Sequence, residues 1–186
     1  MNTLEEQLNK GINVTKEEAK KRYDFQIIGI LDWHKNPKNK DKRSIEQVKK
    51  DTMNSSICEA AIEKAIGGKC NTQDFKGWNP STFAWDVEAP DGTKIEVKWM
   101  STGSDWYSFN EGLVMKLTKY VDEYDKVVVA TPIQTDDGYI VYPRFIFDGK
   151  HFDRYIKASK YDNYKPYYYN HHNPTCTQLN EGVLCQ

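Results

Sequence analysis

The amino-acid sequence predicts an α/β protein in which a mixed β-sheet is flanked by helices. An N-cap signal at Ser44 and apolar residues at helical spacing over 111–124 indicate two long helices. Residues 126–133 and 139–147 are short apolar runs typical of strands, and a turn signal at 90–92 indicates a hairpin before them. The predicted order is helix, several strands, helix, strand, strand, which suits a mixed central sheet.

The composition is that of one globular domain with a polar surface. The chain has 186 residues, of which 38% are hydrophobic and 13% aromatic, enough to bury a core. Charged residues make up 28%, and the mean hydropathy is -0.80. We expect a single domain over 1–186, with a core at about 44–147, an N-terminal helical and basic extension over 1–43, and a Tyr- and His-rich tail over 150–186.

Simple patterns exclude several classes of protein. No apolar run approaches the roughly 20 residues of a membrane span, and the first residues lack the basic and apolar blocks of a secretory signal. The four cysteines show no CxxC spacing, so we expect reduced thiols and a cytoplasmic location. Only four of the 26 basic residues are Arg, a bias typical of AT-rich genomes such as those of bacteriophages, in which case the location is the host cytoplasm.

The first part of the chain is expected to hold helices and one strand. Residues 3–24 are predicted to be helical with a break at Gly11, and the apolar run 25–33 is predicted to be a strand. A lysine-rich loop follows. The helix that begins at Ser44 is expected to end at Gly67, because glycine readily takes the left-handed conformation that closes a helix.

A hairpin around residues 90–92 is predicted to bring two carboxylates together. Pro and Gly in this Pro-Asp-Gly sequence suit a three-residue loop, which sets the register of the flanking strands. Counting outward, Asp86 lies opposite Glu96, and Lys98 lies one step along the same face. The other face of the hairpin is purely apolar and consists of Phe83, Trp85, Val87, Ile95, Val97 and Trp99.

Paired carboxylates at about 5 Å repel each other unless a positive charge lies between them. Lys98 neutralises only part of the negative charge of Asp86 and Glu96. A divalent cation resolves the conflict, and Mg2+ is the usual ion where carboxylates act together with phosphate, with Mn2+ as the expected substitute. Lys98 is then placed to orient a water and to neutralise charge on a phosphate. A solvated strand face with cross-strand ion pairs is the plain alternative.

Asp86, separated by nine residues from Glu96-Val97-Lys98, resembles the signature of the PD-(D/E)xK nuclease superfamily, the restriction-endonuclease-like fold. In that family the Asp lies on one strand of a hairpin, the E-x-K on the next, and the elements follow the order αβββαβ. The resemblance covers about residues 44–133, although Trp85 stands where the family pattern has Pro. It implies a Mg2+-dependent endodeoxyribonuclease that hydrolyses phosphodiester bonds.

The resemblance also implies two further groups around the metal. The family carries an acidic residue on the helix before the hairpin, and Glu59 matches that position, with Glu63 as its substitute. The Val97 carbonyl is the implied third ligand beside Asp86 and Glu96. Since Ser56 precedes Glu59 by three residues, as in a capping box, a purely structural role for Glu59 is equally open.

Phosphate contacts are expected in several regions. Residues 35–50 carry seven Lys or Arg against two acidic residues, although a solvated face has the same pattern. In some nucleases of the family, a Gln-x-x-x-Tyr sequence on the helix after the motif touches phosphate, and here Lys stands in the place of Gln. The aromatic and basic run 155–172 can stack bases or pack over the sheet. The DNA-binding candidates are Lys38, Lys40, Lys42, Arg43, Ser101, Thr102, Lys116 and Tyr120.

The sequence therefore predicts a metal-dependent DNA endonuclease that acts in restriction, in repair or in phage degradation of host DNA. A nucleic-acid-binding module without turnover is the alternative. A zinc-stabilised interaction protein is the third hypothesis, which depends on His171, His172, Cys176 and Cys185 as ligands. DNA is the expected partner, no membrane contact is expected, and a homodimer is left open, as is the choice between single and double strands.

Overall fold

The computed structural model describes residues 3–37, 39, 41–71, 85–102, 107–109, 124–149, 156–158, 167–169 and 176–180. Within these residues the helices are α1 (Leu4–Leu8), α2 (Lys16–His34) and α3 (Ile45–Ile66). The strands are β1 (Ile12–Thr15), β2 (Lys69–Cys70), β3 (Val87–Glu88), β4 (Lys94–Trp99), β5 (Tyr107–Phe109), β6 (Lys126–Gln134), β7 (Gly138–Asp148), β8 (Ile156–Ala158), β9 (Tyr167–Tyr169) and β10 (Cys176–Gln178).

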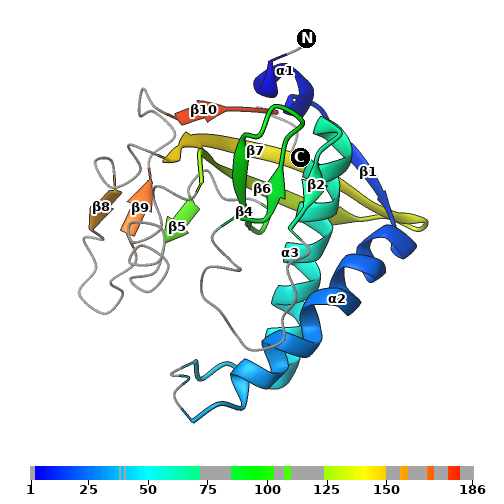
Figure 1. The fold of residues 1–186 in the computed structure, drawn as a ribbon, viewed down its shortest axis with the longest axis vertical. Helices are drawn as coiled ribbons and strands as arrows, with labels where there is room; N and C mark the ends of the chain where they lie inside the picture. Colours follow the sequence, from blue (N-terminus) through cyan, green and yellow to red (C-terminus); the bar gives the residue numbers. More distant parts are fainter. Residues whose placement is uncertain are drawn as a thin grey trace.

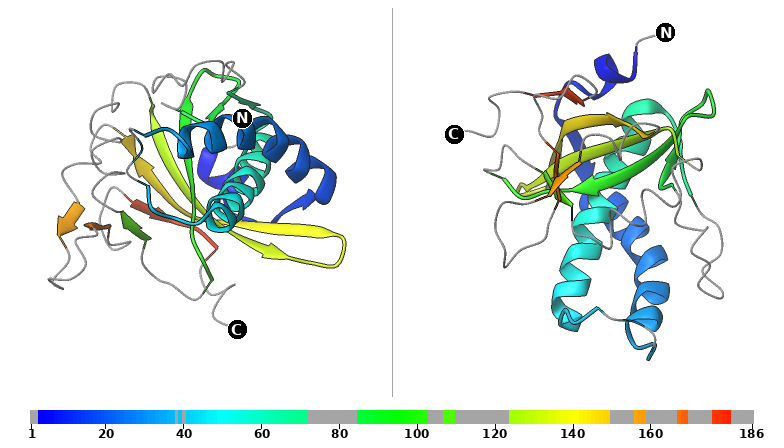
Figure 2. Two further views of the ribbon diagram at one scale, coloured as in Figure 1. Left: turned by 90° about the horizontal axis from the view of Figure 1, so that it is seen from below. Right: turned by 90° about the vertical axis from the view of Figure 1, so that its left-hand side faces the viewer.

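The strands form a seven-stranded mixed sheet and a separate three-stranded one. The large sheet has the order β1-β7-β6-β4-β3-β2, and β10 pairs with β7 beside that path. β4 and β6 are parallel, whereas the other pairings described in this sheet are antiparallel. The small sheet, β5-β9-β8, lies on the opposite side of the molecule from α2 (Figure 1). Figure 2 shows α2 and α3 side by side against the large sheet. The predicted α/β class is confirmed.

Two N-terminal segments differ from the prediction. Residues 12–15, expected to be helical, form β1, in which buried and exposed residues alternate against β7. Residues 25–33, expected to be a strand, are the second half of α2, which begins with a capping box at Thr15. Arg22 and Gln26, one helical turn apart, are buried against α3. These tertiary contacts override the β propensity of the apolar run.

The first and last turns of α3 follow the prediction. The Ser44 side chain accepts a hydrogen bond from the Gln47 N–H at 3.1 Å, and Gly67 closes the helix with φ of 63°, in the left-handed region. Ten of its residues are buried, including Ile57, Ala61 and Ile62. Ile57, Ala61 and Ile62 form one core with Leu8 and with Ile12 and Val14 of β1, so the segment before α3 contributes directly to it.

The register of the predicted hairpin is confirmed. Ala89 and Thr93 are joined by a 2.9 Å backbone hydrogen bond across the loop, and Val87 pairs with Ile95. Val87, Ile95 and Val97 are buried in the core on the α3 side, as the pattern predicted. Trp85 departs from that apolar face, since the Lys94 ammonium lies 5.6 Å from the centre of its ring.

The strands predicted at 126–133 and 139–147 are confirmed as β6 and β7, whereas the helix predicted at 111–124 lies outside the described residues apart from Tyr124. Across β4, β6 and β7, directly paired residues share a face. On the face turned away from α3, one row consists of Glu96, Val127 and Phe147, and the next of Lys98, Val129 and Phe145. In the described part of the chain, no helix combines the length and the apolar composition needed to cross a membrane.

Candidate active site on strands β3 and β4

Asp86, Glu96 and Lys98 meet beside the hairpin, as predicted. Glu96 is fully buried (0% exposed), and its Oε1 forms an ion pair with the Lys98 ammonium. The same ammonium lies 3.9 Å from Asp86 Oδ2 and donates a hydrogen bond to the Val97 carbonyl at 3.1 Å. One cation thus lies among oxygens of the three groups that the sequence predicts as metal ligands on the hairpin.

Asp86 lies at the point where β3 leaves the antiparallel ladder. Its N–H donates to the Ile95 carbonyl at 2.9 Å, and its Oδ2 accepts the Val97 N–H at 2.7 Å. The carboxylate therefore takes the place of the backbone acceptor that a longer β3 would offer to β4. Its side chain is 13% exposed. This single bond fixes Asp86 against the strand that carries the other candidate residues.

Glu59 lies in a buried polar network between α2 and α3. Its Oε2 accepts hydrogen bonds from Arg22 Nε at 2.7 Å and from Gln26 Nε2 at 2.6 Å. Gln26 in turn accepts the Ser56 hydroxyl at 2.7 Å. Burial, the largest single cause, lowers the pKa of Arg22, but the charge of Glu59, its hydrogen bond and the smaller effects of Cys70 and Asp86 together outweigh burial, so the pKa is raised. The Glu59 carboxylate is thus already neutralised by a guanidinium.

A chain of hydrogen bonds connects Glu59 to the hairpin. Arg22 Nη1 donates to the Asn71 carbonyl at 2.9 Å, and the Asn71 N–H donates to the Asp86 carbonyl at 2.8 Å. Asn71 also donates from its side chain to the Trp85 carbonyl at 3.2 Å. The network therefore holds the backbone at Asp86. Sequence reasoning missed Arg22, Gln26 and Asn71; an i,i+4 polar pair inside an apolar segment is the signal for the first two.

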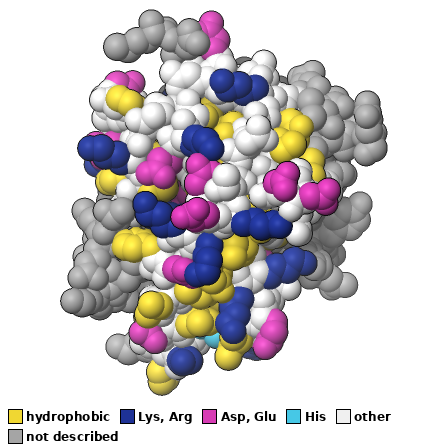
Figure 3. All heavy atoms as spheres, turned by 90° about the vertical axis from the view of Figure 1, so that its right-hand side faces the viewer, with side chains coloured by type: hydrophobic (Ala, Val, Ile, Leu, Met, Phe, Trp, Pro, Cys, Tyr) yellow, Lys and Arg dark blue, Asp and Glu magenta, His cyan; other side chains and the backbone are white. Residues whose placement is uncertain are grey.

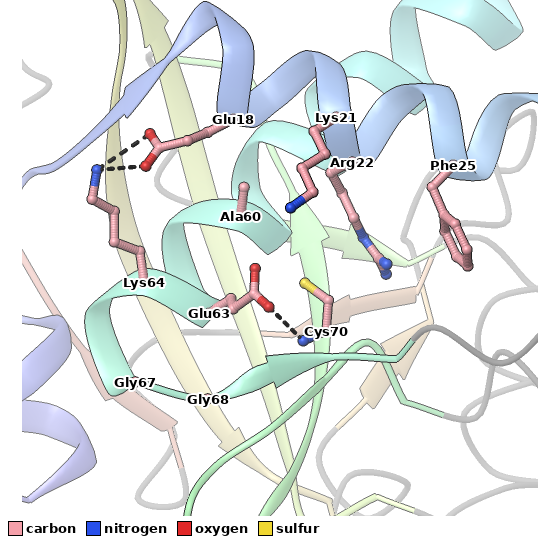
Figure 4. A pocket seen from close by; sticks show the side chains of 10 residues that line it. All are labelled: Glu18, Lys21, Arg22, Phe25, Ala60, Glu63, Lys64, Gly67, Gly68 and Cys70. Atoms are coloured by element: carbon pink, nitrogen blue, oxygen red, sulfur yellow. Dashed lines mark hydrogen bonds and ion pairs between the residues drawn. The ribbon is translucent and has the colours of Figure 1, made fainter.

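A cavity of about 580 Å³ adjoins this network, between α2, the end of α3 and β2 (Figure 4). The figure shows Arg22 and the Cys70 thiol at one end of it and the Glu18–Lys64 ion pair at the other. Glu63 accepts the Cys70 N–H at 2.9 Å, and burial raises the pKa of the Cys70 thiol, which therefore stays protonated.

The other predicted contact residues are scattered. Ser101 and Thr102 are exposed directly after β4. Arg43 is bound to Asp41 at 2.5 Å and to Asp51 at 2.6 Å, so its charge is balanced within the protein, whereas Lys42 is exposed. The side chains of Lys38, Lys40, Lys116 and Tyr120 lie outside the described residues.

The zinc hypothesis has little support in the described residues. Cys176 on β10 pairs with Phe147 on β7, and burial raises the pKa of the Cys176 thiol to about 12. His171, His172 and Cys185 lie outside the described part. Within that part, Cys58, Cys70 and Cys176 are free thiols, and no group of three His, Cys, Asp or Glu side chains converges as metal ligands would.

The fold and the site define the class of protein: an α/β nuclease-like protein with an acidic pair and a lysine on one hairpin. The model of the bacteriophage T4 endonuclease IV family matches residues 3–171. The chain belongs to this family. A comparison with curated proteins gives no match. Membership confirms the nuclease predicted from the sequence, while the PD-(D/E)xK assignment stays a prediction.

Proposed function

We propose that the protein is a metal-dependent endonuclease that hydrolyses phosphodiester bonds in DNA, with Asp86, Glu96 and Lys98 as its catalytic residues. The observation that carries this proposal is the convergence of two carboxylates and one backbone carbonyl on a single ammonium, Lys98 Nζ. Family membership supports the endonuclease activity independently of this geometry. The PD-(D/E)xK pattern supports the choice of DNA and of hydrolysis.

The donor atoms fit a hard divalent cation such as Mg2+, with Mn2+ as a substitute. Two carboxylate oxygens, from Asp86 and Glu96, and the Val97 carbonyl oxygen surround the Lys98 ammonium. Oxygen is also the ligand atom that Mg2+ prefers. When bound, Mg2+ supplies charge stabilisation at the phosphate and lowers the pKa of a bound water. Glu59 remains a candidate for the outer part of this site, because its network holds the backbone at Asp86.

The residues of the chain have separate tasks in this proposal. Glu96 is buried and anchored, so it holds a cation in a fixed place. Asp86 is 13% exposed and its Oδ2 accepts the Val97 N–H, so its carboxylate is held in a fixed place beside Glu96 and Lys98. Lys98, 19% exposed, orients the attacking water and meets the charge that develops on the phosphate. If Asp86 and Glu96 held a metal, the Lys98 ammonium would be free of Glu96 for that task.

The deciding experiment compares the wild-type protein with Asp86→Asn on plasmid and on single-stranded circular DNA, with Mg2+ or with EDTA. Asparagine still offers an oxygen to the Val97 N–H, so the hairpin should keep its shape. A neutral amide is a much poorer ligand for a hard cation, so cleavage should fall by a factor on the order of 100 or more. The rate of loss of circular DNA measures the effect.

Glu88→Gln is the matched control. Glu88 lies two residues after Asp86, toward the hairpin loop, and pairs with Lys94 on β4. This variant should cleave at the wild-type rate. Circular dichroism shows whether each variant is folded. A folded Asp86→Asn protein that cuts at the wild-type rate with Mg2+ would refute the proposed site, and cleavage in EDTA would refute the metal requirement.

A further inference from the structure

The cavity between α2, the end of α3 and β2 has the size of a small-molecule site. Its volume is about 580 Å³, within the range of about 300–1,000 Å³ that is usual for such sites. Long side chains from one face of α2 form one wall: Glu18, Lys21, Arg22 and Phe25. Small residues of α3 and β2 lie on the opposite wall: Ala60, Gly67, Gly68 and Cys70. Because Lys21 and Lys64 in its lining are exposed, the cavity can be reached from solvent.

Lys21 and Glu63 present opposite charges to this cavity. Lys21 forms no ion pair with any residue that the structure describes, and Figure 4 shows its ammonium directed into the cavity. Glu63 accepts the Cys70 N–H with Oε1, and its other oxygen points toward the cavity in the same figure. The Glu63 carboxylate would repel a simple anion. A ligand that satisfies both groups therefore carries an anion for Lys21 and an N–H donor for Glu63.

Phe25 adds a flat apolar surface at the edge of the cavity. It is 36% exposed, one of the few large apolar side chains at the surface of the described residues. The Arg22 guanidinium carbon lies 5.6 Å from the centre of its ring, and Arg22 is itself held by Glu59. An aromatic ring fixed in this way packs well against another flat ring. The third part of the ligand is therefore a planar ring system.

The surface around α2 favours a small ligand that is recognised inside the cavity. Figure 3 shows the side of the molecule that carries α2, where Lys and Arg side chains are interspersed with Asp and Glu. Two ion pairs on this helix are Lys20 with Asp24 and Lys64 of α3 with Glu18. Interspersed charges of both signs give little long-range attraction for a polyanion. Binding here depends on contacts within the cavity.

We propose that this cavity binds one nucleotide, with its base against Phe25, an N–H group of the base at Glu63 and its phosphate at Lys21. A nucleotide combines the planar ring, the N–H donor and the anion that the three side chains require. The inference goes beyond the proposed function, because it uses none of the catalytic residues on the hairpin. The nucleotide has two possible sources: one residue of a bound DNA strand, or a free mononucleotide.

The first experiment compares thymidine monophosphate with its two fragments, thymidine and inorganic phosphate, by calorimetric titration of the protein in EDTA. Thymidine monophosphate should bind more tightly than either fragment. Lys21→Met should weaken its binding by a factor on the order of 10 and leave thymidine unaffected. Phe25→Leu should weaken binding of the nucleotide and of thymidine several-fold. Wild-type affinities in both variants would overturn the inference, and so would equal affinity of the wild-type protein for inorganic phosphate and for the nucleotide.

α2 offers a matched control for each variant. Lys20→Met removes the neighbouring exposed charge, which pairs with Asp24 and does not line the cavity. Ile28→Ala removes a 69% exposed apolar side chain from the same helix, outside the cavity lining. Both controls should bind thymidine monophosphate as the wild-type protein does, and an equal loss in them would overturn the assignment to this cavity. Circular dichroism checks the folding of each variant, and the fragment comparison needs only the wild-type protein.

The same variants identify the source of the nucleotide when a labelled single-stranded oligonucleotide is titrated in EDTA at several salt concentrations. If the nucleotide belongs to a DNA strand, Lys21→Met reduces the salt slope by about one, whereas Phe25→Leu lowers affinity at an unchanged slope. If the nucleotide is free, both variants bind the oligonucleotide as the wild-type protein does but lose affinity for thymidine monophosphate. Either result supports the nucleotide site. Failure of the wild-type protein to cleave DNA with Mg2+ refutes the proposed function instead, because these binding measurements do not depend on cleavage.

Discussion

The ammonium of Lys98 lies where a metal ion would have to contact the hairpin. It pairs with the buried Glu96, lies 3.9 Å from Asp86 Oδ2 and binds the Val97 carbonyl. In the absence of a metal, it therefore neutralises carboxylates that would otherwise repel each other. Under the proposed function, Lys98 both takes part in catalysis and stabilises the metal-free fold, and adding a metal separates the two roles.

Lys98→Met tests this double role. Without a metal, Glu96 loses its cation in a fully buried place, so the free energy of unfolding should fall by about 3–5 kcal/mol. Saturating Mg2+ should restore stability, since a ligand present at 100 times its Kd stabilises by about 2.7 kcal/mol. Urea unfolding with and without Mg2+ measures both effects.

Lys94→Met on the same strand is the control for this measurement. The Lys94 ammonium lies 5.6 Å from the centre of the Trp85 ring, two residues along β4 from Glu96. Its loss should cost little stability and should leave the response to Mg2+ at the wild-type level. No stabilisation of Lys98→Met by Mg2+ would contradict metal binding between Asp86 and Glu96, and equal responses in the two variants would contradict competition between Lys98 and the metal.

At the scale of elements, α2 and α3 pack through polar groups. The buried residues of α2 are Ala19, Arg22 and Gln26, and the last two bind Glu59 on α3. A buried ion pair of this kind specifies how two helices meet, although it adds little net stability compared with apolar packing. The same network holds Asn71 and, through it, the strand at Asp86.

Removing one charge of this network should be far more costly than removing both. Glu59→Gln leaves the Arg22 guanidinium buried without a counter-charge, and it should lower the free energy of unfolding by about 3–5 kcal/mol. The double variant Arg22→Met with Glu59→Gln removes both charges, and its free energy of unfolding should fall clearly less than that of Glu59→Gln. Chemical denaturation of the two single variants and the double variant gives the coupling energy.

The same double variant also decides the predicted metal role of Glu59. If the folded double variant binds Mg2+ as tightly as the wild-type protein, Glu59 acts only through the network. If the double variant is stable but has lost Mg2+ affinity, Glu59 belongs to the metal site. If the double variant lost as much free energy of unfolding as the two single variants together, Arg22 and Glu59 would not be coupled, which would contradict the network.

Local signals explain which elements could be predicted from the sequence. The hairpin register follows from the turn at residues 90–92 and from the alternation beside it, both of which are local, so the meeting of Asp86, Glu96 and Lys98 was predictable. The second half of α2 was not, because its buried face carries Arg22 and Gln26 instead of an apolar stripe. Hydrophobic periodicity cannot detect a helix that packs through hydrogen bonds.

Asn71 could be found only in the structure, because it acts through hydrogen bonds to Arg22 and Trp85, which are distant in the sequence. It belongs to no spacing pattern with the acidic pair. The family match, which begins at residue 3, agrees with the contribution of β1 and α2 to the same core.

At the scale of the whole molecule, acid should destabilise the fold through carboxylates that are hydrogen-bonded in the native state. The pKa of Glu18 is lowered, first by its hydrogen bond from the Thr15 N–H and then by Lys64. The pKa of Asp41 is lowered, first by the hydrogen bond from the Arg43 side chain. A lowered pKa means that stability is present above the ordinary value and is lost as pH falls through the native value.

We therefore expect the free energy of unfolding to fall as pH drops below about 4.5, the ordinary pKa of Glu18. Glu18→Gln should have a shallower decline over this range, because it removes one of the groups whose pKa changes on folding. Urea unfolding between pH 3 and pH 6, a range set by the carboxyl pKa values of about 4, measures the slopes. Glu17→Gln on the same first turn is the control, and identical slopes for wild type and Glu18→Gln would contradict the expectation.

The net charge of -1 gives the whole molecule no general attraction for nucleic acid. Binding must therefore come from local groups, and the basic stretch 35–50 is less available than its composition suggests. Arg43 is committed to Asp41 and Asp51. Lys42 beside it is exposed and has no ion-pair partner among the residues that the structure describes.

Lys42 and Arg43 are expected to affect DNA binding differently. Lys42→Ala should reduce the slope of log affinity against log salt by about one if the stretch contacts a phosphate, and it should leave stability unchanged. Arg43→Ala should hardly change that slope, because its charge is already balanced, and it should instead loosen the start of α3 near Asp51. Fluorescence titrations at several salt concentrations, with urea unfolding of the same variants, separate the two effects. An unchanged slope in Lys42→Ala would place the DNA path away from this loop, whereas an equal reduction by Arg43→Ala would show that Arg43 contacts a phosphate in spite of its ion pairs.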